Sequence, residues 1–141
     1  LNMETLWQQA YPSECVIVRP TGIYGTSVTR MIKLAGTTKS YPKLHWSNRI
    51  HVDDLAAFLA HLLHVEHTEK SYICTNSRPL PLHEIIQWFQ QQLGLPALVL
   101  ESNKSSGKQI YATRMQQMNF ELQHPHCFDD YLALLAERES K

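Results

Sequence analysis

The sequence predicts an α/β fold with parallel strand pairing. Two short apolar runs, residues 15–20 and 71–75, are rich in β-branched and other apolar residues, which is typical of strands buried on both faces of a parallel sheet. Amphipathic helical patterns precede, separate and follow these runs, and this alternation indicates a sheet covered by helices. The length of 141 residues fits one domain, so we expect residues 1–141 to form a single unit.

Composition excludes several classes of protein. Thirteen Lys and Arg balance thirteen Asp and Glu, whereas a nucleic-acid-binding protein normally carries a basic surplus that neutralises phosphates. No apolar run approaches the roughly 18–20 residues that span a bilayer, and no export signal opens the chain. The three cysteines are far apart and form no CxxC motif, which is typical of reduced thiols. We therefore expect a cytoplasmic protein without a nucleic-acid or membrane partner.

The first half of the chain follows from local signals. Residues 1–10 are typical of the last turns of a helix, which Pro12 follows. After the first strand, residues 21–27 form a loop, Ser27 caps a helix over 28–35, and Gly36 ends it. Residues 37–49 show no clear period, so we expect a loop with one or two short, solvent-facing strands.

Two helices with apolar stripes flank the second strand. Asp53 can cap a helix over 50–67, and a helix over 83–94 ends at Gly94, shortly before Pro96. The core-facing spacing i, i+3, i+4, i+7 picks out Leu55, Phe58, Leu59, Leu62 and Leu63 in the first helix, and Leu82, Ile85, Ile86, Phe89 and Leu93 in the second.

The last third contains weaker signals. Residues 97–101 form a further strand, and an exposed turn follows to residue 108. Thr113 caps a short helix that Asn119 ends in a left-handed conformation. Residues 128–141 form a closing amphipathic helix.

Four segments then point to a known family. They are VIVRPTGIYG (16–25), IHVDDLA (50–56), the block YICTN with PLHEII and LGLP (72–96), and KQIYATRMQQMNFEL (108–122). In this order they resemble the C-terminal half of extended short-chain dehydrogenase/reductases, the NAD(P)-dependent epimerase/dehydratase family. Asn119 stands where that family usually has glycine. The resemblance implies part of a Rossmann-like parallel sheet, with two core strands, and a small, mostly helical substrate-binding lobe.

Two parts of the family's machinery are missing from this sequence. The five glycines do not form a Gly-rich dinucleotide loop, and none of the six tyrosines has a lysine four residues later. The resemblance implies that the chain is a C-terminal fragment without catalytic residues of its own. The intact protein would transfer a hydride between NAD or NADP and a carbonyl or alcohol carbon of a sugar-like substrate. The chain alone should be inactive and hold no cofactor tightly.

The resemblance also implies cofactor contacts after the first strand. Ligands of open α/β sheets bind at the carboxyl ends of strands, and there the backbone of Pro20, Thr21, Gly22 and Ile23 would contact the nicotinamide end of the cofactor. The alternative is that these residues merely form a turn between a strand and a helix.

Substrate binding is assigned to Tyr24, Arg49 and His51. Family members that act on nucleotide sugars often hold a phosphate with a basic residue just before the His-Val motif, and arginine suits this role because its guanidinium donates bidentately. Arg49 lies closer to His51 than the usual arginine does, so this sequence departs from the nucleotide-diphosphate pattern. A structural role, hydrogen-bonded inside the fold, is the alternative for His51. Asp53 and Asp54 are interpreted as capping carboxylates rather than a catalytic pair.

Other residue groups give weaker hypotheses. A metal site would need converging ligands, and we expect none. His61, His64 and His67 are typical of solvated surface residues, and no fourth ligand is evident for the group His124, His126 and Cys127. Trp88 lies outside the apolar stripe of its helix, which indicates either a partner surface or a surface covered by the missing half.

Two functions remain open. The first is the substrate lobe of an NAD(P)-dependent enzyme that binds a small-molecule substrate. The alternative is a non-enzymatic binding module that reuses the fold. Because a strand pair cut from its sheet exposes an edge, we also expect self-association through that edge, or association with the missing N-terminal half.

Overall fold

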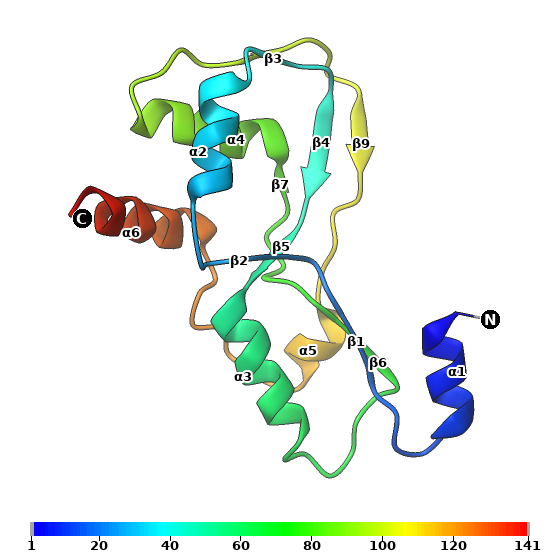
Figure 1. The fold of residues 1–141 in the computed structure, drawn as a ribbon. Helices are drawn as coiled ribbons and strands as arrows, with labels where there is room; N and C mark the ends of the chain where they lie inside the picture. Colours follow the sequence, from blue (N-terminus) through cyan, green and yellow to red (C-terminus); the bar gives the residue numbers. More distant parts are fainter. Residues whose placement is uncertain (1, 141) are drawn as a thin grey trace.

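Two apolar strands pair in parallel in the lower half of Figure 1, which shows the computed structural model, described here for residues 2–140. β1 (Ile17–Pro20) lies in register with β6 (Ser71–Cys74), so that Ile17 faces Ser71 and Pro20 faces Cys74. This pairing confirms the predicted parallel arrangement. With α3 (Val52–Leu62) and α5 (Thr113–Gln117), these strands make up what we call the lower lobe.

Only one face of the β1–β6 pair is buried. Val16, Val18 and Tyr72 pack against Phe58 of α3 and Met115 of α5 in a single apolar cluster. On the other face Ile73 remains 41% exposed and Arg19 is also exposed. The prediction that both strands are buried on both faces is therefore wrong for this chain, because no helix packs on the second face among the described residues.

A second pair of strands connects the lower lobe to the rest of the molecule. β2 (Gly22–Tyr24) runs parallel to β5 (Arg49–His51), and Tyr24 lies opposite His51. The sequence predicts a loop over residues 21–27, which contains β2, and a helix from residue 50, where Ile50 and His51 belong to β5, so both predictions are wrong for these strands. Strands of three residues are too short to show a period, and β5 is buried throughout its length.

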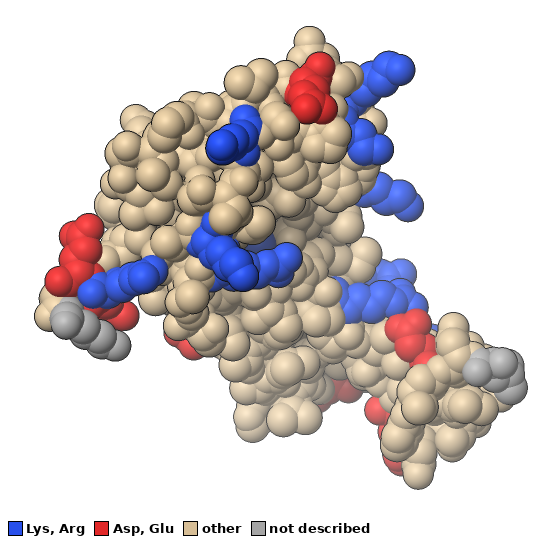
Figure 2. Space-filling view, turned by 45° about the horizontal axis from the view of Figure 1, so that its top comes forward, with Lys and Arg blue, Asp and Glu red and all other residues tan. Residues whose placement is uncertain are grey.

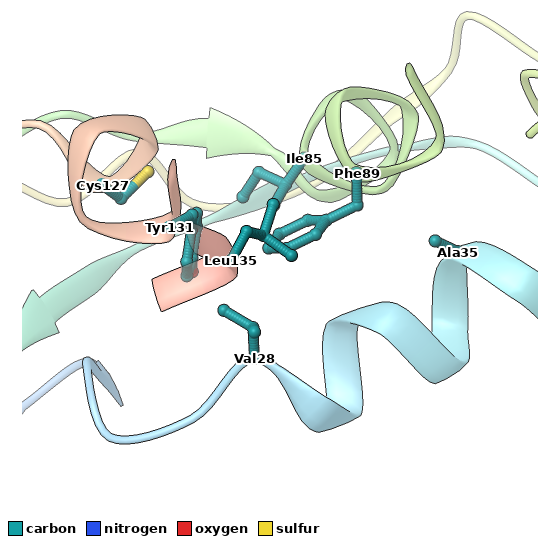
Figure 3. Close-up of a cluster of buried hydrophobic side chains, with 7 residues drawn as sticks. All are labelled: Val28, Ala35, Ile85, Phe89, Cys127, Tyr131 and Leu135. Carbon is teal, nitrogen blue, oxygen red and sulfur yellow. The ribbon is translucent and has the colours of Figure 1, made fainter. Parts of the chain in front are cut away.

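Three helices build what we call the upper lobe, which also contains the remaining small sheets. α2 (Thr29–Thr37), α4 (Leu82–Gln92) and α6 (Cys127–Glu139) enclose the apolar cluster of Figure 3, which contains Val28, Ala35, Ile85, Phe89, Cys127, Tyr131 and Leu135. Burial of these side chains is the main stabilising contribution to this lobe.

Five short strands edge the upper lobe. β3 (Ser40–Tyr41) pairs in parallel with β8 (Val99–Leu100). β4 (Leu44–Ser47) pairs antiparallel with β7 (Leu80–Pro81) and parallel with β9 (Ser105–Gly107). The strand predicted over 97–101 is confirmed, whereas the exposed turn predicted up to residue 108 contains β9.

Gln90 joins three segments of the upper lobe. Its side chain is 1% exposed. Nε2 donates to the carbonyl oxygens of Ala35 (3.1 Å) and Thr38 (2.9 Å), and Oε1 accepts from the backbone N–H of Leu98 (2.8 Å). α4 is thereby tied to the end of α2 and to the segment that enters β8.

Several predicted helix boundaries differ from the structure. His51, not Asp53, caps α3, because its Nδ1 accepts from the Asp53 N–H at 3.0 Å. α3 ends at Leu62 rather than at residue 67, which leaves Leu63 exposed. Leu59, also predicted in the apolar stripe, is exposed as well.

Other helix ends show smaller differences. α2 continues through Gly36, although the Ser27 hydroxyl does accept from the Thr29 N–H at 3.1 Å. Thr113 makes no capping hydrogen bond in α5. The left-handed conformation of Asn119 is confirmed by a φ of 55°.

Two tryptophans differ in exposure. Trp88 is half-buried because α6 covers it, and its ring centroid lies 5.1 Å from that of Phe128. It therefore does not form an open partner surface. Trp7 lies on α1 (Met3–Ala10), a helix with no buried residue. An ion pair between Glu4 and Arg19, at 2.8 Å, connects this helix to β1.

None of the helices within residues 2–140 combines the length and the apolar character required to cross a bilayer. Figure 2 shows side chains of both charges on one face of the molecule, with basic groups near its middle and along one edge.

Candidate functional site

A cavity of about 360 Å³ opens beside β2 and β5. Its walls come from five parts of the chain: residues 22–27, residues 47–49, helix α2, helix α4, and Tyr131 of α6. Because β2 follows β1 after a single residue, the cavity lies just beyond the carboxyl end of a core strand. This is where open α/β sheets bind their ligands.

The structure brings some of the predicted site residues together at this cavity. Gly22, Ile23, Tyr24 and Arg49 line it. Gly22 allows the two strands to approach closely, since a Cβ there would lie 3.1 Å from the carbonyl oxygen of Asn48.

The other three predicted residues lie outside the lining. Pro20 ends β1, and the backbone N–H of Thr21 donates to the Cys74 carbonyl at 3.0 Å. His51 lies behind Tyr24, with its ring centroid 5.2 Å from that of the tyrosine. The binding roles of all seven residues stay predictions.

Arg49 is a buried cation without an acidic partner. Its side chain is 5% exposed, one guanidinium nitrogen donates to the Ser47 hydroxyl, and Nη1 has no hydrogen-bond partner. Within residues 2–140 Arg49 forms no ion pair with a carboxylate. A charge in this situation is costly unless it is compensated. An anion in the cavity would supply that compensation.

The weakly acidic neighbours of Arg49 do not neutralise it. Burial raises the pKa of Tyr131 to about 12, and Arg49 only partly opposes this effect. Burial likewise raises the pKa of the Cys127 thiol, again against the influence of Arg49. Both groups are therefore protonated and neutral near pH 7, and the guanidinium keeps its full charge. Arg30 adds an exposed second cation at the same cavity.

Tyr24 is held from behind by groups that the sequence did not identify. Its hydroxyl donates to Asp130 Oδ2 at 2.6 Å, and the other carboxylate oxygen lies 2.6 Å from His124 Nδ1. The His124 ring stacks on His51 with a centroid separation of 3.6 Å and an interplanar angle of 7°. Burial and, next, the bond to Asp130 raise the pKa of Tyr24 above its usual range, so its phenol stays neutral.

His51, His124 and Asp130 also form the only group within residues 2–140 whose ligand atoms are close enough for a metal, all within 4.8 Å. Their geometry does not fit one. The two rings are stacked, so their nitrogen lone pairs run side by side instead of converging as a metal requires. Gly25 lies close to the His51 ring, where a Cβ would meet Nε2 at only 2.4 Å.

Sequence reasoning missed Arg30, Asp130 and His124. Asp130 belongs to the acidic first turn of α6, which has the pattern of ordinary helix-dipole compensation. His124 was considered only with His126 and Cys127. Local spacing cannot reveal either role, because Tyr24 and Asp130 are 106 residues apart.

No family model matches the chain, and no curated protein matches it. Among solved structures it is similar to a protein from Methylobacillus flagellatus assigned to the NAD-dependent epimerase/dehydratases. The identity is 31%, the match covers 95% of this chain and 52% of that one, and the TM-score is 0.72.

Two further structures share the fold at low identity. The dTDP-glucose 4,6-dehydratase from Bacillus anthracis is 14% identical, over 98% of this chain and 49% of its own, with a TM-score of 0.70. The UDP-N-acetylglucosamine 4-epimerase from Bacillus cereus is 12% identical, over 93% and 53%, with a TM-score of 0.65. The chain thus spans about half the length of the proteins it matches. Its fold and its extent are consistent with the C-terminal half of the NAD-dependent epimerase/dehydratases that it resembles.

Proposed function

We propose that the cavity beside β2 and β5 binds the anionic part of a small-molecule substrate. The observation that carries this proposal is Arg49, a guanidinium 5% exposed at the cavity wall and without a carboxylate partner. Arg30 provides a second charge, while Met31, Leu82 and Ile85 provide an apolar surface. Phosphate or carboxylate groups match the planar donor pattern of arginine.

The intact protein is then an NAD- or NADP-dependent oxidoreductase, epimerase or dehydratase that acts on a sugar-like or other carbonyl or alcohol substrate. The names of the solved structures support this class, since they include a dTDP-glucose dehydratase in complex with NAD and an enzyme from Bordetella bronchiseptica in complex with NAD and UDP. Both of these named nucleotides carry phosphates, as the buried arginine requires.

The cofactor contacts belong to the same proposal. Residues 20–23 follow the carboxyl end of β1 and would face the nicotinamide end of the cofactor. Ile23 fits this role, because its side chain is 54% exposed beside the cavity and offers an apolar surface to a ring. The sequence lacks the Gly-rich loop and the Tyr-x-x-x-Lys pair, so we expect no hydride transfer and only weak cofactor binding by this chain alone.

Direct binding measurements test the anion site. We expect UDP to bind the chain, and uridine, which lacks the phosphates, to bind at least tenfold more weakly. Arg49→Met should weaken UDP binding about 10- to 100-fold, because hydrogen bonds to charged groups contribute about 1.5–3 kcal/mol. Arg138→Met, which removes an exposed arginine of α6, is the matched control. Equal UDP affinity of the wild type and Arg49→Met would refute the proposal.

The uncovered face of the β1–β6 pair is the proposed docking surface. Each of these strands has one unpaired edge within the described residues, and Trp7 and Tyr11 of the adjoining segment are about half exposed. The matched structures contain about as much chain again, and we propose that the corresponding half covers this face in the intact protein. In isolation, two copies would cover each other. Size-exclusion chromatography with light scattering should show a dimer or larger species; a monomer at all concentrations contradicts this.

We also propose a cytoplasmic location for the protein. The three cysteines, Cys15, Cys74 and Cys127, are free thiols, as expected in a reducing compartment.

A further inference from the structure

Two adjoining cavities lie in a part of the molecule that the proposed function does not use. Their volumes are about 390 Å³ and about 180 Å³. Both are lined by Asn76 and Arg78, which follow β6, and by Pro125, which precedes α6. They share no lining residue with the cavity beside β2 and β5. The carboxyl end of β6 is again the end at which open α/β sheets bind ligands.

Asn76 brings an unpaired hydrogen-bond donor to both cavities. The residue is 4% exposed. Its backbone N–H donates to the Arg49 carbonyl at 2.8 Å, and its Oδ1 accepts from the Arg78 N–H at 3.0 Å. Nδ2, in contrast, is buried and has no hydrogen-bond partner within residues 2–140. A buried donor without an acceptor is unfavourable, so a ligand that offers an acceptor here removes this cost.

The segment that carries Asn76 is fixed by the fold itself. The Thr75 hydroxyl donates to the Arg49 carbonyl at 3.1 Å, and the Ser77 hydroxyl accepts from the Ala112 N–H at 2.9 Å. Together with the backbone bond of Asn76, these contacts attach the segment to β5 and to the residue before α5. Because the donor is already held in place, little conformational entropy is lost when it binds a ligand.

The wall that the two cavities share carries a positive charge. The Arg78 side chain is exposed, and within residues 2–140 it forms no ion pair with a carboxylate. Glu121 lines only the larger cavity, whereas the described residues around the smaller one include no Asp or Glu. An anion is therefore favoured in the smaller cavity, where the Asn76 amide and the Arg78 guanidinium can both donate to it.

The remaining wall of the smaller cavity is mostly apolar. It consists of Leu80, Pro125, Cys127 and Phe128, together with His126. Its volume lies below the roughly 300–1,000 Å³ of pockets that enclose drug-sized molecules, so the ligand is small. We infer that this cavity binds the carboxylate of a small organic acid, whose apolar part lies against Leu80 and Phe128. One guanidinium and one amide suit a singly charged carboxylate better than a doubly charged phosphate.

Phenylacetate is the probe, because it joins a carboxylate to a compact apolar ring. In heteronuclear NMR spectra the side-chain amide of Asn76 is the NH₂ pair that disappears in Asn76→Asp. We expect this pair to shift as phenylacetate is added, and the uncharged phenylacetamide to bind about fivefold more weakly or less. If phenylacetate shifts the backbone amides of Gly22 and Gly25 but not the Asn76 side chain, it binds at the other cavity and the inference is wrong.

Two variants test the two donors separately. Arg78→Gln should weaken phenylacetate binding by about fivefold or more, because it removes the charge at the shared wall. Arg138→Gln, an exposed arginine of α6 that lines neither cavity, is the matched control. Asn76→Asp keeps the oxygen that accepts from the Arg78 N–H but turns a second carboxylate toward the ligand, so binding should weaken by about tenfold or more. Equal affinity of the wild type and Arg78→Gln refutes the inference, whether or not Asn76→Asp folds.

UDP distinguishes this site from the proposed anion site. Phenylacetate should bind with the same affinity with and without UDP, since the cavities have no lining residue in common. If UDP displaces phenylacetate, the two ligands occupy one site and the inference is wrong. If UDP does not bind at all while phenylacetate shifts the Asn76 amide, the proposed function is wrong and the carboxylate site stands.

Discussion

Replacing Gln90 by leucine should destabilise the upper lobe by about 2–4 kcal/mol. The leucine fills the buried space but leaves three backbone groups without their partner: the Leu98 N–H and the carbonyl oxygens of Ala35 and Thr38. A buried donor left unpaired costs about 1–3 kcal/mol. The two carbonyls add a smaller amount, because each has a second lone pair and the Thr38 carbonyl is only partly buried.

A glutamate at the same position distinguishes the contribution of the amide oxygen from that of the amide NH₂ group. Gln90→Glu keeps the acceptor for Leu98 N–H but turns the donor into a carboxylate oxygen that faces two carbonyls. The folded state then favours the protonated side chain, which can donate again. Because the folded state binds more protons than the unfolded state, the free energy of unfolding of this variant should rise as the pH falls from neutral toward the unfolded glutamate value of about 4.3, and level off below it.

Urea unfolding followed by tryptophan fluorescence measures both effects, since Trp88 lies on the same helix. With an m-value of about 1–3 kcal/mol/M, a loss of this size moves the midpoint by about 1–2 M. Gln91→Leu, an exposed neighbour on α4, is the control and should stay within about 0.5 kcal/mol of the wild type. If Gln90→Leu and Gln91→Leu unfold at the same urea concentration, the structural role assigned to Gln90 is refuted.

Three further outcomes follow. Arg49→Met should raise the free energy of unfolding by about 1–3 kcal/mol while UDP binding weakens, because an unpaired buried charge is removed; a less stable variant in urea unfolding argues against this. Gly25→Ala should lower the free energy of unfolding by more than about 2 kcal/mol, since φ is +118° and the Cβ would meet an imidazole at 2.4 Å. Gly36→Ala, with open space in a helix, should raise the free energy of unfolding by about 0.5–1 kcal/mol. Equal shifts of the melting temperature in the two variants would contradict both expectations. Asp130→Asn should lower the pKa of His124 in an NMR titration, because the hydrogen bond to that carboxylate is the main cause of its elevation. The stability contributed by this raised pKa is present below the unfolded value of about 6.5 and is lost as the pH rises through the folded value; an unchanged titration in the variant would disprove the assignment.

Periodicity was sufficient to predict the elements with long or strongly apolar patterns. In α4 the stripe Ile85, Ile86 and Phe89 is buried as expected, and β1 and β6 pair in parallel. Short strands escaped prediction because their existence depends on a distant partner: β2 needs β5, and β9 needs β4. A run of two to four residues carries no measurable period, so only the folded chain reveals it.

The candidate site was predictable only in part, and for a physical reason. Tyr24 and Arg49 came from motifs that resemble a family, and both line the cavity. The groups that determine their chemistry come from elsewhere: Asp130 and His124 from the end of the chain, and Arg30 from α2. That no carboxylate of residues 2–140 pairs with Arg49 is a property of packing, which no local pattern contains.

The two apolar clusters draw on alternating stretches of the chain. Residues near 16–18, 50–62, 72–74 and 112–122 build the lower cluster, while residues 24–35, 80–89 and 127–135 build the upper one. During synthesis the upper cluster therefore cannot close before α6 has left the ribosome. Until then Val28, Ile85 and Phe89 lack their partners in the cluster, and transiently exposed apolar surface of this kind promotes aggregation.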